Sequence, residues 1–257
     1  MPPDRAEVSP APGDDQTVTT VTVRTEYTLC PGTESLRAVT AVGHVDGEPD
    51  ETKRRVAYFT ETVGDQAVVP GDRLIAIDAG ASSPLMVFVP ILARLFLALD
   101  RGGVDIGWSG YVVGSDIVSK MLHSIAPLVG ARSLAEVDVT APEPGFSEPR
   151  GMKVFLVTEP DPGGLAKLLG VVPDGSLIAL LVPHIEASHT PINFYETIHK
   201  KSLTLLGQEA HQTGSLQNAV RFATTRLDGF AADYPVLDSS STEKLAEATT
   251  GAILRWT

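Results

Sequence analysis

Histidine and glutamate side chains gather directly after two predicted strands, Ser176–Val182 and Ser202–Leu206. The residues are His184, Glu186 and His189 after the first strand, and Glu209 and His211 after the second. Histidine suits acid–base chemistry near neutral pH, and a neighbouring carboxylate can orient the ring or raise its pKa. In an open α/β sheet, the carboxyl ends of the strands line the ligand crevice. The pattern favours proton abstraction and return at that edge, although solvated loop residues would have the same composition.

A second motif, Gly114-Ser115-Asp116-Ile117-Val118-Ser119, follows a short apolar strand. It keeps one of the three glycines of a dinucleotide-binding turn, with Asp116 in the second position and Ser119 in the third. A carboxylate about 4 Å from a pyrophosphate charge would cost roughly 4 kcal/mol at an effective dielectric of ~20. Asp116 could instead cap the helix that begins there. Both interpretations predict a weak or vestigial cofactor site at Gly114, Ser115 and Asp116.

Asp138 ends the next predicted strand, Ser133–Val139, where an acidic residue would hold the ribose hydroxyls of a dinucleotide. An exposed carboxylate at the end of a strand would explain it equally well. A metal site is not expected. Cys30, His44 and Glu34 fit no compact ligand spacing, and a small cysteine packed in a turn is the simpler interpretation.

The elements that position these residues form two groups. The first hundred residues are β-rich and close with an apolar helix near 84–99. From Gly107 onward, strands alternate with helices, which predicts a parallel sheet covered on both faces. The predicted helices in this part lie at 117–129, 163–169, 194–200 and 215–227, and the tail is read as a strand, a helix at 240–249 and a strand at 252–256.

The bulk composition limits the partners. A formal charge of −12 over 257 residues argues against nucleic acid and anionic membranes. Residues 1–16 lack the basic and apolar regions of a secretory signal and are expected to form a flexible tail. The apolar stretch Pro84–Leu99 is too short to span a bilayer. The single cysteine fits a reducing compartment, and the chain is expected to be cytoplasmic.

Four stretches, in this order, resemble the medium-chain dehydrogenase/reductase superfamily in its zinc-independent branches. They are Val23–Thr28 with Pro31–Ser35, Val69–Ile75, Pro173–Ile178 and Lys201–Gly207. The resemblance implies an α/β fold with a Rossmann-like domain at 101–232. It also implies a reduced GroES-like domain at 17–100 and 233–257, because the chain is shorter than such proteins usually are.

The resemblance further implies a homodimer, joined near Ser202–Leu206, and a cleft that Tyr27, Glu34 and Tyr58 could reach. Asp116 and the reduced GroES-like domain favour a metabolic enzyme that acts on a small molecule without NAD or NADP. Its reaction would be an isomerisation, elimination or cyclisation in a specialised biosynthetic pathway. The alternative is a zinc-independent oxidoreductase that depends on NAD(P)H. A non-catalytic accessory subunit is the third hypothesis.

Overall fold

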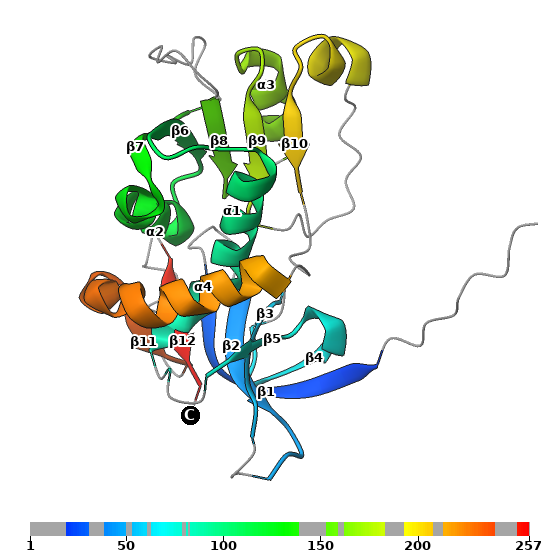
Figure 1. Ribbon diagram of the computed structural model, residues 1–257. Helices are drawn as coiled ribbons and strands as arrows, with labels where there is room; N and C mark the ends of the chain where they lie inside the picture. The colour runs from blue at the N-terminus through cyan, green and yellow to red at the C-terminus, as the bar shows by residue number, and fades with distance from the viewer. Residues whose placement is uncertain are drawn as a thin grey trace, which may run out of the picture.

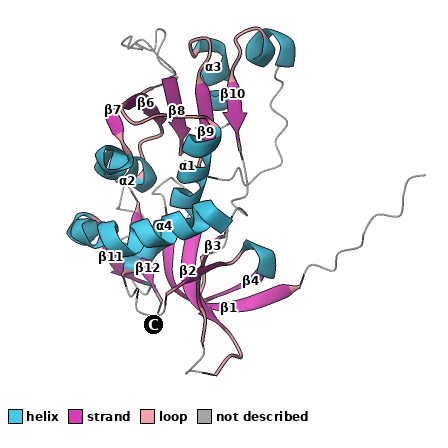
Figure 2. Ribbon diagram, in the orientation of Figure 1, coloured by secondary structure: helices cyan, strands magenta, loops and turns pink. Residues whose placement is uncertain are grey.

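The computed structural model describes residues 19–30, 39–49, 53–60, 63–78, 81, 83–138, 153–158, 162–182, 193–207, 213–239 and 251–256. These residues form two sheets with helices between and around them (Figures 1 and 2). Both the β-rich and the alternating groups are therefore present, and the expected α/β fold class is confirmed.

One sheet has seven strands, drawn from both ends of the described chain. They are β1 (Thr20–Cys30), β2 (Thr40–Val45), β3 (Arg55–Phe59), β4 (Gln66–Pro70), β5 (Ile75–Ile77), β11 (Val236–Asp238) and β12 (Ala252–Arg255). The order is β11-β12-β1-β2-β3-β5, with β4 also pairing with β1. Only β11 and β12 run parallel; the other pairs are antiparallel. Buried and exposed residues alternate in the first half of β1, whereas Thr28, Leu29 and Cys30 at its end are all buried, so that this end is covered on both faces.

The other sheet has five parallel strands. They are β6 (Trp108–Val113), β7 (Ala131–Glu136), β8 (Lys153–Val157), β9 (Leu177–Leu180) and β10 (Thr204–Leu206), in the order β10-β9-β8-β6-β7. In the usual doubly wound sheet, strands numbered along the chain lie in the order 3-2-1-4-5-6. Here β6 and β7 correspond to strands 1 and 2, and β8, β9 and β10 correspond to strands 4, 5 and 6. The third place, beyond β7, holds no strand in the described part of the chain. The connection direction reverses between β6 and β8, so the ligand crevice is expected at their carboxyl ends.

Helices join and cover the sheets. They are η2 (Pro84–Phe88) with α1 (Val89–Arg101), α2 (Ile117–Ile125) with η3 (Ala126–Val129), α3 (Pro162–Val171), η4 (Tyr195–His199), and α4 (Thr213–Arg226) with η5 (Leu227–Asp233). Pro90 stands in the first turn of α1, where the helix needs no backbone N–H. Most residues of α1 are apolar and buried. In Figure 1, α1 stands between the parallel sheet and α4, and α1 packs directly on α4.

Predicted and observed boundaries differ by a few residues. The strand predicted at 133–139 runs over Ala131–Glu136, because it extends along β6 from Trp108 onward. The helix predicted at 194–200 is a single wide π-helical turn, Tyr195–His199, rather than an α-helix. An additional short 3-10 helix, η1 (Gly71–Arg73), precedes β5. The helix predicted at 240–249 lies outside the described residues.

Candidate functional site

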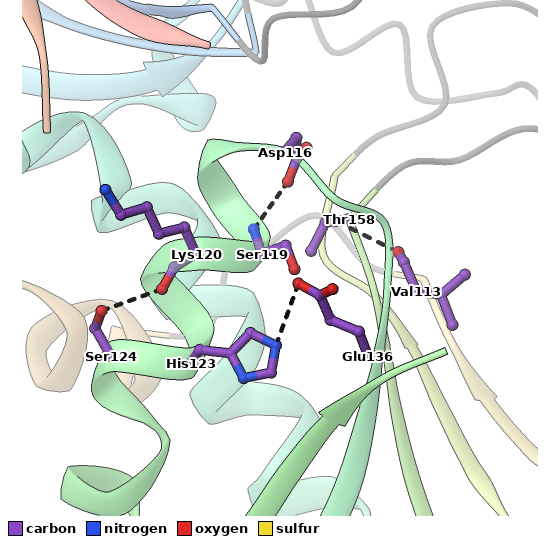
Figure 3. Close-up of polar contacts among 8 residues, drawn as sticks. All are labelled: Val113, Asp116, Ser119, Lys120, His123, Ser124, Glu136 and Thr158. Carbon is purple, nitrogen blue, oxygen red and sulfur yellow. Dashed lines mark hydrogen bonds and ion pairs between the residues drawn. The ribbon is translucent and has the colours of Figure 1, made fainter. Parts of the chain in front are cut away.

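The carboxyl ends of β6 and β8 lie side by side at the reversal point of the parallel sheet. Thr158, the residue after β8, donates its backbone N–H to the carbonyl of Val113 at 3.0 Å, and its hydroxyl lies 3.4 Å from the same oxygen. Thr158 is almost completely buried. These contacts tie the two strand ends together at the point where the chain leaves β6 for the Gly114 turn (Figure 3).

Gly114 makes that turn with a φ of 131°, a conformation that residues with a Cβ rarely adopt. The chain then enters α2 at Asp116, whose carboxylate accepts the backbone N–H of Ser119 at 2.8 Å. Asp116 is buried, with 7% of its surface exposed. The prediction that Asp116 is a helix N-cap is therefore confirmed.

The cap has an electrostatic consequence. A helix N-terminus attracts anions because its first N–H groups and its dipole both favour negative charge. Here an internal carboxylate already occupies that position and bonds one of the N–H groups. Ser119 fills the third glycine place, and its buried hydroxyl has no hydrogen-bond partner within the described structure. An incoming phosphate would meet the negative charge of Asp116 before the helix terminus.

The carboxyl end of β7 lies beside that of β6 in the parallel sheet. Glu136, the last residue of β7, lies with its Oε1 atom 3.7 Å from Nε2 of His123 on α2 (Figure 3). Asp138 follows two residues later and is exposed. Its assignment to the ribose hydroxyls remains a prediction, and Glu136 is a second carboxylate at the same edge.

Six of the predicted acid–base residues lie outside the described residues: His184, Glu186, His189, Glu209, His211 and Glu34. The strands that precede the histidine-bearing segments, β9 and β10, do end at the carboxyl edge of the parallel sheet. Catalysis by any of these six side chains therefore stays a prediction.

The two tyrosines lie on different faces of the seven-stranded sheet. Tyr27 is half-buried against the main core, and the guanidinium of Arg255 stands 6.0 Å from its ring centre. Tyr58 is fully buried in a separate cluster with Val23 and Val56, and its hydroxyl lies 2.9 Å from that of Thr25. The Tyr58 hydroxyl is thus bonded inside that cluster, and a catalytic role for either tyrosine stays a prediction.

Sequence reasoning missed Arg94, a charged residue in the apolar helix α1. Its guanidinium stacks 4.1 Å from the ring centre of Phe59 on β3 and donates to the carbonyl of Leu181, just after β9. Only 8% of Arg94 is exposed. The residue thus joins the seven-stranded sheet to the carboxyl edge of the parallel sheet. A lone arginine in an apolar helix was the available signal.

A second missed cluster lies on the seven-stranded sheet. One carboxylate oxygen of Glu26 lies 2.7 Å from Nε2 of His44, and the other lies 2.8 Å from Nε of Arg55. Arg55 is buried, with only 4% exposed. His44 and Arg55 are opposite each other on β2 and β3, and Arg24, two residues before Glu26, is opposite His44 on β1. His44 is therefore engaged with a carboxylate.

Cys30 packs in a small cluster with Ala252 and Leu254. Burial raises the pKa of its thiol to about 12. The thiolate, which is the form that binds metals, is therefore strongly disfavoured at neutral pH. Cys30 behaves as a small hydrophobic residue.

In the portion of the chain that the structure describes, no helix is long and apolar enough to cross a membrane.

Comparison with known proteins rests on structure, since no family model and no curated protein matches the sequence. Alcohol dehydrogenase TADH from Thermus sp. ATN1 aligns over 94% of this chain and 95% of its own, with 13% identity and a TM-score of 0.62. Galactitol-1-phosphate dehydrogenase from Escherichia coli aligns over 92% of this chain and 92% of its own, with 12% identity and a TM-score of 0.57. The yhdH oxidoreductase from Salmonella enterica in complex with NADP aligns over 95% of this chain and 93% of its own, with 16% identity and a TM-score of 0.56.

These matches cover both sheets and more than nine-tenths of each chain. The chain has the fold of the medium-chain dehydrogenases and reductases, with a Rossmann-like parallel sheet and a GroES-like β-rich sheet. The fold that the sequence resemblance implied is confirmed.

Proposed function

We propose that the protein is a zinc-independent oxidoreductase that binds NAD or NADP weakly and acts on a small molecule. The observation that carries the proposal is Gly114, held at a φ of 131° between β6 and α2 at the reversal point of the parallel sheet. In dinucleotide-binding proteins of this fold, a glycine makes the tight turn at this place between the first strand and its helix. Structural neighbours include proteins solved with NADP or NADPH, which adds support.

The residues fit the cofactor only in part. Gly114 and the N-terminus of α2 would hold the pyrophosphate, and Asp138 or Glu136 would hold the ribose hydroxyls. The bound nicotinamide would supply or accept a hydride. Asp116 opposes this binding, because its buried carboxylate caps the same helix terminus. An acidic pair at the ribose edge also favours NAD, since a 2′-phosphate would add further repulsion.

A second candidate is acid–base chemistry without a nicotinamide. Asp116 is the observation that favours it, since a carboxylate that already caps α2 leaves less room and less positive potential for phosphate. The histidine-bearing segments after β9 and β10 would then supply His184, His189 and His211 as proton carriers. Homodimerisation through the edge strand β10 belongs to both candidates and is likewise a proposal.

The test is titration of the purified protein with NADH and NADPH by calorimetry, comparing the wild type with Asp116→Gly and Asp116→Asn. Removing the charge should tighten binding at least tenfold, within a limit of about a thousandfold set by roughly 4 kcal/mol of repulsion. Asp72→Asn, which removes the same charge from the exposed turn η1 between β4 and β5, is the control and should leave the affinity unchanged. If neither the wild type nor Asp116→Gly binds either cofactor, the oxidoreductase proposal fails.

A further inference from the structure

The chain crosses between the two sheets through a pair of 3-10 helices. It leaves the seven-stranded sheet through η2, before α1, and returns through η5, after α4. η5 is seven residues long, whereas most 3-10 helices do not exceed three or four residues. The two crossings pack against each other, with the rings of Phe88 and Tyr234 edge to face at 5.6 Å.

Tyr234, which directly follows η5, also packs against α2. Its hydroxyl lies 3.4 Å from the hydroxyl of Ser124 and 3.8 Å from the sulfur of Met121. Only 3% of Tyr234 is exposed. Burial raises the pKa of Tyr234, so the hydroxyl remains protonated at neutral pH and can donate a hydrogen bond. One side chain thus joins both crossings to the helix that follows the Gly114 turn.

Lys120 on α2 also contacts Tyr234 and the end of η5. Its ammonium donates to the carbonyl of Asp233 at 2.6 Å and stands 5.1 Å from the ring centre of Tyr234. The lysine itself is exposed on α2. Figure 3 shows Lys120 pointing away from His123 and Glu136, so it takes no part in the carboxylate contact at β7. A charged donor to a carbonyl, placed over an aromatic ring, combines two favourable interactions in one side chain.

We propose that Lys120 and Tyr234 are positioning residues, which hold α2 and its Gly114 turn at a fixed angle to the segment that returns to the seven-stranded sheet. The anchored residues lie just one and two turns along α2 from Asp116, so a shift at this contact would move the helix terminus. The inference rests on the proposed cofactor site. Neither residue belongs to the Gly114 turn or to the acidic edge that would hold the cofactor.

Lys120→Met tests the contact, because it keeps most of the side chain's length and removes only its charge and donors. We expect cofactor affinity to fall about tenfold, the loss typical of one charge-assisted hydrogen bond. Lys120→Arg keeps the cation and should restore wild-type affinity. Lys200→Met, which removes an exposed lysine paired with Glu196, is the matched control and should bind normally. Melting temperatures should be close for all four proteins, so a loss of affinity would not reflect unfolding.

Amide hydrogen exchange provides a readout that needs no cofactor. In Lys120→Met, the amides of α2 and η5 should exchange several-fold faster than in the wild type, while those of β1 and β2 stay unchanged. Tyr234→Phe, which keeps the ring and loses the hydroxyl contacts, should give a smaller change in the same segments. Unchanged exchange in Lys120→Met, or unchanged affinity in a protein that binds cofactor, would overturn the positioning role. Lack of cofactor binding by both the wild type and Asp116→Gly would instead contradict the proposed function, and exchange alone would then decide whether the contact holds α2.

Discussion

Gly114 and Asp116 stand two residues apart and have opposite effects on a dinucleotide. The glycine permits the backbone turn that the site requires, whereas the aspartate caps α2 with a negative charge. Both roles could be predicted from the sequence, since a glycine after an apolar strand and an aspartate before an apolar helix are local signals. The burial of Asp116 could not be predicted from the sequence, because it depends on elements that are distant along the chain.

Gly114→Ala should destabilise the protein by about 1–2 kcal/mol, because a Cβ is strained at positive φ. Gly47→Ala is the matched control, since Gly47 has a φ of 79° in a turn with open space around it. Both variants should lose similar stability in urea denaturation, but only Gly114→Ala should also weaken NADH or NADPH binding. Equal cofactor affinity in the two variants would show that the turn is structural alone.

Cys30 makes stability depend on alkaline pH. Its thiol stays protonated in the fold up to a pKa of about 12, against a reference value of 9.0. Between these values the unfolded chain binds fewer protons than the native protein. The free energy of unfolding should therefore fall as pH rises through this window, by up to about 1.4 kcal/mol per pH unit for one group. Below pH 9 the contribution is fully present.

Urea denaturation at pH 7, 9 and 10 checks this dependence. The wild type should lose roughly 1 kcal/mol more than Cys30→Ala between pH 9 and 10. Tyr58 and Tyr234, whose pKa values are also raised by burial, remain in both proteins and contribute equally. Parallel pH profiles for the two proteins would contradict the assignment to Cys30.

At the scale of elements, the alternation of strands and helices predicted most of the architecture. The periodic segments became β6 to β10 with α2, α3 and α4, although their ends moved by a few residues. Local patterns could not predict the bulge in β1 or the cluster of Glu26, His44 and Arg55. Glu26 and Arg55 are 29 positions apart, and only the sheet register brings them together.

Two glycines should respond to alanine in opposite ways. A Cβ on Gly43, which faces the bulge of β1, would lie 2.2 Å from the backbone oxygen of Arg24. Gly43→Ala should therefore cost about 2–3 kcal/mol through backbone displacement. Gly170, in the last turn of α3, has open space around it. Gly170→Ala should stabilise by about 0.5 kcal/mol, because alanine loses less backbone entropy in a helix. Chemical denaturation of both variants tests the pair, and a neutral Gly43→Ala would mean that the bulge can relax.

At the scale of the whole molecule, the two sheets share one hydrophobic core. Leu29 and Ile253 from the seven-stranded sheet belong to the same buried cluster as Val112 and Leu156 from the parallel sheet, with α1 between them. The sequence suggested two domains because its patterning changes near residue 100. A change in periodicity marks a change in element type, but it does not tell whether the resulting layers bury a common surface.

A shared core predicts a single cooperative unfolding transition for both sheets. The chain has two tryptophans, and each reports on one sheet. Trp108 lies in β6 and is buried in the shared core, whereas Trp256 follows β12 and donates its indole N–H to Thr28 on β1 at 2.9 Å. The variants Trp108→Phe and Trp256→Phe each leave one fluorescent reporter.

In urea, the single-tryptophan signal of each variant should follow the same curve as that variant's far-ultraviolet circular dichroism. Leu92→Ala on α1, at a site 1% exposed, should lower the free energy of unfolding by about 2–5 kcal/mol. Combined with either tryptophan variant, it should move both reporters to lower urea by the same amount, because α1 contributes to the core of both sheets. If Leu92→Ala shifted the Trp108 signal and left the Trp256 signal in place, the two sheets would unfold independently, and the chain would consist of two domains with separate stabilities.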